Sequence, residues 1–85
     1  MDPLEIRFTK AARKHRVGRA SVRNAMASTA PTRTITDRGN IAWLFVGLDE
    51  RNRELEIIAV EVEREEEHEA FLLVIHVMPT NLKKR

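Results

Sequence analysis

The chain of 85 residues has no cysteine and no tyrosine, a single tryptophan, and only three glycines and three prolines. Without cysteine it cannot form the disulfides that small secreted domains usually need, so a reducing cytoplasm is the expected location. No apolar run approaches the roughly 18 residues of a membrane span, and the first residues do not resemble a signal peptide. We therefore expect one cytoplasmic domain over residues 1–85, without a membrane partner.

The net charge of +2 conceals two regions of opposite sign. Residues 1–40 hold nine basic side chains against three acidic ones, a net charge of +6, and residues 49–69 hold ten acidic against three basic, a net charge of −7. A basic half indicates a polyanionic partner such as nucleic acid, although charge that only keeps a small domain soluble is the alternative. The acidic stretch Glu61–Glu69, which includes His68, matches no metal-ligand spacing, so we expect a solvated loop, no metal and no cofactor.

Apolar periodicity predicts an α+β fold. Alternating or continuous apolar runs predict strands at 4–8, 41–48, 55–62 and 71–78, and a weaker one at 32–36. Helices are expected at 10–16 and 19–28, with Thr9 as a cap and Gly18 in a backbone conformation that other residues resist. The prediction is two short N-terminal helices packed on one face of a small, mainly antiparallel β-sheet, whose other face is open or covered by another molecule.

The two predicted helices carry a basic strip on their outer side. Val22, Ala25, Met26 and Thr29 form the inward stripe of the second helix. The outward strip consists of Arg13, Arg16, Arg19 and Arg23. Such residues attract a phosphate backbone without reading sequence, unless the strip is simply a solvated face.

The strand at 71–78 is the most apolar segment of the chain and contains one polar group, His76. Simple alternation places Val74, His76 and Met78 on one face of that strand. The strand is followed by the basic residues Lys83, Lys84 and Arg85. Histidine, lysine and arginine together can supply the base, the acid and the cations of metal-independent RNA cleavage. The alternative is a structural histidine that is bonded to the backbone.

The order of elements resembles the RelE/ParE superfamily of bacterial toxins. Arg13-Lys14-His15-Arg16-Val17 is similar to the Arg-Lys-His-Gly-Ile/Val signature of BrnT-like toxins, with Arg16 in the place of the glycine. Residues 74–79, Val-Ile-His-Val-Met-Pro, are similar to a segment of actinobacterial relatives of that group. The resemblance implies a RelE/BrnT-like fold, an endoribonuclease that cleaves messenger RNA, a cognate antitoxin that neutralises it, and contact with DNA only through that antitoxin.

From these observations we predict a catalytic set and an RNA-binding set. His76, Lys83 and Lys14 form the predicted catalytic set. The predicted RNA-binding residues are Arg13, Arg16, Arg19, Arg23, Lys84 and Arg85. The alternative function is a non-catalytic binding module, in which the arginines hold a partner protein or a nucleic acid. Trp43 and Phe45 share a strand face and either stack on a base or pack in the core.

Overall fold

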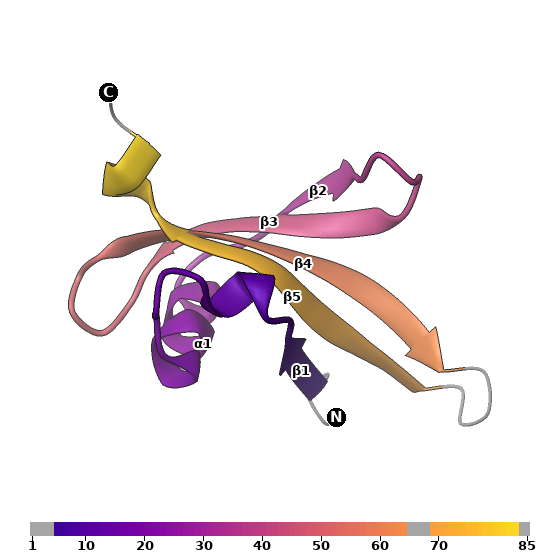
Figure 1. Ribbon diagram of the computed structural model, residues 1–85, viewed down its shortest axis with the longest axis horizontal. Coiled ribbons are helices and arrows are strands. Elements are labelled where there is room, and N and C mark those ends of the chain that lie inside the picture. The colour runs from indigo at the N-terminus through magenta and orange to yellow at the C-terminus, as the bar shows by residue number, and fades with distance from the viewer. Residues whose placement is uncertain (1–4, 65–68, 84–85) are drawn as a thin grey trace.

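The computed structural model describes residues 5–64 and 69–83, which form one sheet, one α-helix and two short 3₁₀ turns. Figure 1 shows α1 and the first 3₁₀ turn lying on the same side of the sheet. Along the chain the elements are β1 (Glu5–Phe8), η1 (Ala11–Arg13), α1 (Arg19–Ala27), β2 (Thr32–Ile35), β3 (Ile41–Leu48), β4 (Glu54–Arg64), β5 (Glu69–Pro79) and η2 (Thr80–Lys83).

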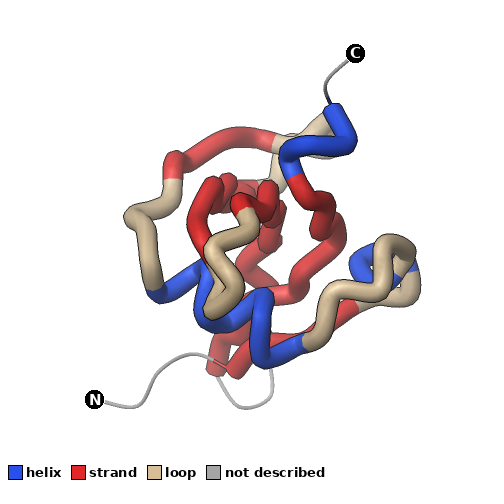
Figure 2. Tube along the Cα trace, turned by 90° about the vertical axis from the view of Figure 1, so that its left-hand side faces the viewer, coloured by secondary structure: helices blue, strands red, loops and turns tan. Residues whose placement is uncertain are grey.

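The five strands lie in the order β1-β5-β4-β3-β2. The predicted meander is present, because β3, β4 and β5 pair antiparallel through neighbouring strands, and β2 adds antiparallel to β3. The edge strand β1 instead pairs parallel with β5, with Glu5 opposite Phe71 and Phe8 opposite Val74. Seen end-on, the strands follow a curved path rather than a flat layer (Figure 2).

The fold predicted from the sequence is wrong in two respects: the described chain has one α-helix instead of two, and its sheet is mixed. The expected helix at 10–16 is reduced to the 3₁₀ turn η1, although Thr9 Oγ1 does accept a 3.1 Å hydrogen bond from the Ala12 N–H. η1 ends at Arg13, and a helix could not continue through Arg16, whose φ of 58° is left-handed. Gly18, expected to hold the unusual conformation, is extended at φ −67° and ψ 154° and serves as the N-cap of α1.

One face of the sheet, called here the covered face, packs against α1 and η1. Three residues of the predicted inward stripe, Val22, Ala25 and Met26, are buried as expected. The fourth, Thr29, is half-buried and lies beyond the end of α1. The main strand residues of this core are Phe45, Leu55, Ile57, Ala59, Val74 and Val77. The apolar burial on this face is the main stabilisation of the domain, at about 25 cal/mol for each Å² of apolar surface removed from water.

The opposite face of the sheet, called here the open face, carries apolar side chains that remain in part accessible. Cross-strand neighbours share a face, so the register of the ladder identifies its members. They include Leu44, Val46, Leu48, Ile58, Val60, Val62, Phe71, Leu73 and Met78. Val46 and Leu48 are 42% and 46% exposed, and they lie at the end of β3 that extends beyond its pairing with β2.

Candidate functional site

His76 lies on the open face, where it pairs with a carboxylate of the neighbouring strand. Its Nε2 atom is 3.2 Å from Oε1 of Glu56, and the exposed fractions of the two side chains are 36% and 17%. The imidazole is therefore accessible to solvent and to a ligand while one of its nitrogens is held. A histidine oriented by a carboxylate is a common arrangement for general acid–base chemistry.

A β-bulge in β5 decides which face His76 occupies. Val74 and Val77 both point into the core, opposite Ala59 and Ile57, although three positions apart they would lie on opposite faces of a regular strand. The register shift between Ile58 and Ala59 accommodates the extra residue. The predicted grouping of Val74 with His76 is therefore wrong: Val74 faces the core, and His76 lies opposite Ile58 on the open face.

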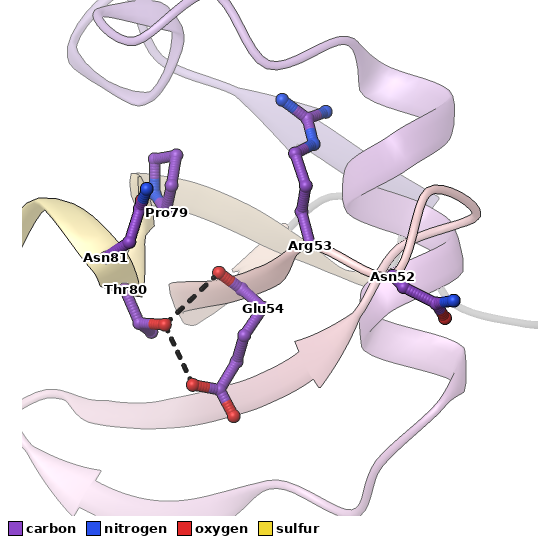
Figure 3. Close-up of a pocket in the computed structure, with 6 residues that line it drawn as sticks. All are labelled: Asn52, Arg53, Glu54, Pro79, Thr80 and Asn81. Carbon is purple, nitrogen blue, oxygen red and sulfur yellow. Dashed lines mark hydrogen bonds between the residues drawn. The ribbon is translucent and has the colours of Figure 1, made fainter.

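A polar hollow of about 280 Å³ lies where β5 ends and β4 begins (Figure 3). It is lined by Asn52, Arg53, Glu54, Pro79, Thr80 and Asn81. Thr80 Oγ1 donates a 2.8 Å hydrogen bond to Oε1 of Glu54, which joins η2 to β4. Because Glu54 and Glu56 alternate along β4, both carboxylates belong to the open face near His76.

The turn between β3 and β4 is fixed by Asp49. Burial by itself would raise the pKa of Asp49, but the backbone N–H groups of Arg53 and Arg51 and the Arg53 guanidinium together lower that pKa below its ordinary value. The three donors lie 2.9, 2.8 and 2.8 Å from the Asp49 carboxylate. The guanidinium of Arg53 is therefore engaged with Asp49 at the rim of the polar hollow.

Glu50 ties the same turn to α1. Its Oε2 accepts a 2.8 Å hydrogen bond from Ser21 Oγ, and its Oε1 accepts a 3.1 Å bond from Asn24 Nδ2. Both hydrogen bonds lower the pKa of Glu50, and the bond from Ser21 has the larger effect. The end of the sheet that bears the His76 pair is thus braced against the helix on the covered face.

A cation and an aromatic ring lie farther along the open face. Arg7 Cζ sits 4.5 Å from the ring centroid of Phe71, and Arg7 Nε donates a 2.8 Å ion-paired hydrogen bond to Glu5. The register places Arg7 beside Leu73, on the same face as His76. Arg7 therefore adds a positive charge to the face that carries His76.

The predicted basic strip lies on the other side of the molecule. Its four arginines and Lys14 are exposed on the segment that packs over the covered face. These residues are Arg13, Arg16, Arg19 and Arg23. Arg19 Cζ lies 5.7 Å from the ring centroid of Phe8, and His15 is half-buried. The four arginines and Lys14 therefore lie on the segment from η1 to α1, and the structure does not bring them to His76.

The remaining predicted residues fall at the end of the described chain. The backbone of Lys83 belongs to η2, directly beyond the polar hollow, but its side chain lies outside the description. Lys84 and Arg85 lie outside the described residues altogether, as does His68 of the acidic stretch. In the described ranges, no three His, Cys, Asp or Glu residues gather into a possible metal site.

Two residues of the open face were not predicted from the sequence. Glu56 could have been found from the alternation Glu54-Leu55-Glu56-Ile57, which places both acids opposite the core residues of β4. Arg7 could have been found from the alternation Glu5-Ile6-Arg7-Phe8 in β1. Neither pattern reveals that these side chains share a face with His76, because that depends on the pairing of β5 with both neighbours.

Comparison with known proteins gives no significant match to a protein-family profile, to a curated protein or to a solved structure. Within the described residues, no helix has both the length and the apolar character needed to cross a membrane.

Proposed function

We propose that this chain is the toxin of a bacterial toxin–antitoxin pair and cleaves RNA in the cytoplasm, without a metal ion, at the His76–Glu56 pair. The observation that carries the proposal is the partly exposed imidazole, held 3.2 Å from a carboxylate on the uncovered face of the sheet. The motif at 13–17 supports the toxin assignment. Arg16 has the left-handed φ of 58° at the position where the related signature has glycine, the residue that adopts this conformation most readily.

The hydrogen bond assigns the proposed role of each nitrogen. A carboxylate accepts only, so in the neutral imidazole Nε2 carries the proton that it donates to Glu56, and Nδ1 keeps its lone pair. Nδ1 of His76 takes the proton of a ribose 2′-hydroxyl, whose oxygen attacks the adjacent phosphorus. The bond from phosphorus to the 5′-oxygen breaks, and that oxygen takes a proton from Lys83 or water. The products are a 2′,3′-cyclic phosphate and a 5′-hydroxyl.

Positive charge for the phosphate comes, in this proposal, from two sources. Arg7 belongs to the open face, and Lys83, Lys84 and Arg85 follow the strand that carries His76. Arginine and lysine stabilise the charge that builds on the phosphate oxygens during the attack. The antitoxin neutralises the toxin by covering the same apolar face, which would remove His76 from RNA.

The test is RNA cleavage by the purified protein, with growth arrest on controlled expression as the second readout. His76→Ala should lower the cleavage rate by about 10²- to 10⁴-fold, the usual contribution of general acid–base catalysis. The matched control is His15→Gln, which removes the imidazole that lies on the covered side. Wild-type protein that cleaves no RNA, or equal losses in the two variants, would refute the proposal.

The second candidate is a non-catalytic module that binds RNA or a partner protein through the basic strip. The observation that favours it is the exposure of Arg13 and Arg19 on the side of the molecule opposite His76. The double variant Arg13→Ala/Arg19→Ala separates the two functions. If it abolishes growth arrest while His76→Ala leaves growth arrest intact, binding through the strip carries the effect.

A further inference from the structure

The covered face contains an apolar hollow that lies beyond the area packed by α1. Its volume is about 250 Å³, and it is lined by Pro31, Trp43, Phe45, Glu61 and Leu72. Phe45 is 7% exposed and forms part of the core, whereas Trp43 and Leu72 are only half-buried. The hollow is therefore bounded by the buried ring of Phe45 and by the partly accessible indole of Trp43.

Among the described residues that line this hollow, Glu61 is the only charged one. It is exposed, and the structure records no hydrogen bond or ion pair for it within the described part of the chain. Glu63, two positions farther along β4, is also exposed and adds negative charge at the same end of the sheet. A ligand that fits here has an apolar stem and a positively charged head.

We infer that this hollow is a docking site for a basic peptide segment of a partner protein, which inserts an arginine or lysine side chain. The methylene stem packs against Leu72 and Pro31, the cation lies against the electron-rich face of Trp43, and Glu61 neutralises its charge. Nucleic acid is disfavoured as the occupant because the negative charges of Glu61 and Glu63 repel its phosphates. The inference does not rest on RNA cleavage, since the hollow and His76 occupy opposite faces of the sheet.

The experiment uses the wild-type chain and two capped tripeptides, acetyl-Leu-Arg-Leu-amide and the same peptide with citrulline. Citrulline keeps the size and shape of arginine but carries no charge. Trp43 is the only tryptophan, so its fluorescence reports directly on this hollow. The arginine peptide should change the emission saturably, and the citrulline peptide should bind at least about threefold more weakly.

Two matched variants locate the charge that is responsible. Glu61→Gln should weaken binding of the arginine peptide by roughly two- to fivefold, as expected for a partly exposed ion pair. Glu63→Gln removes the same charge two positions away and should change the affinity by less than about twofold. The inference is overturned by the absence of saturable binding, by equal binding of the two peptides, or by equal effects of the two variants.

Discussion

Ser28 Oγ accepts a 3.0 Å hydrogen bond from the backbone N–H of Leu48 and donates a 2.8 Å bond to the carbonyl oxygen of Ala25. This hydroxyl thus joins the C-terminal end of α1 to β3. At the same point Gly47 passes directly under the helix, and a Cβ there would collide with the Ala25 carbonyl oxygen. The contact sets how closely the helix packs on the covered face.

Gly47→Ala should therefore lower the free energy of unfolding by about 1–3 kcal/mol, because the backbone of α1 has to move. The measurement is urea unfolding followed by Trp43 fluorescence. Gly18→Ala is the matched control, because no atom lies within 4 Å of the added methyl group. Its effect should stay within about 0.5 kcal/mol, and a larger loss there than at position 47 would contradict this packing.

Arg16→Gly should stabilise the protein. A residue with a Cβ in the left-handed region costs about 1–2 kcal/mol, and glycine adopts it freely at some loss of chain entropy. The expected net gain is about 0.5–1 kcal/mol of unfolding free energy. Arg16→Ala removes the same charge but keeps the Cβ, so it should show no gain. If both variants gain equally, charge repulsion rather than backbone conformation is responsible.

The Asp49 turn should contribute stability that depends on pH. Its folded pKa lies below the ordinary 3.8, so the contribution is present above that pH and is lost as the pH falls through the folded pKa. Asp49→Asn should therefore be less stable than wild type at neutral pH, and the difference should shrink in acid. Asp37→Asn is the control, since Asp37 is exposed and no ion pair is recorded for it in the described chain. A difference that does not vary with pH would refute the role of ionised Asp49.

Because of the bulge in β5, the protein should still fold after deletion of one strand residue, Ile75. Without Ile75, Val74 and Val77 are two positions apart, so both still face the core and His76 stays on the open face. Loss of the half-buried Ile75 should cost about 1–2 kcal/mol. Deletion of Ile58 places the buried residues Ile57 and Ala59 on opposite faces, which should prevent folding. Amide NMR spectra distinguish the outcomes, and equal damage by both deletions would contradict the assigned bulge.

The strands and the inward stripe of α1 were predictable because alternation and helical periodicity are local properties of the sequence. Residues 41–48, for instance, match β3 at both ends. The bulge was not predictable, because an uninterrupted apolar run such as 71–75 gives no indication of which residue is extra. Alternation alone therefore gave the wrong neighbours for His76, although it identified the strand that carries it.

The prediction of a helix at 10–16 was wrong for a different reason. Residues 10–16 have acceptable helical periodicity, and this periodicity does not reveal the left-handed turn at Arg16, which lies in the connection from η1 to α1. The candidate site was predicted in part. His76 is accessible, as acid–base chemistry requires, but Glu56 and Arg7 join it only through long-range strand pairing, and the helical arginines lie on the other side of the sheet.

The parallel pairing of β1 with β5 has a consequence for biosynthesis. The first strand has its neighbour about 65 positions later, and the Thr9 N–H donates a 3.0 Å hydrogen bond to the Val74 carbonyl oxygen. Until β5 has left the ribosome, β1 lacks the strand with which it pairs, and β4 lacks one of its two partners. A nascent chain of this protein should therefore stay sensitive to proteases until residue 79 has emerged from the ribosome, and then acquire resistance in a single step.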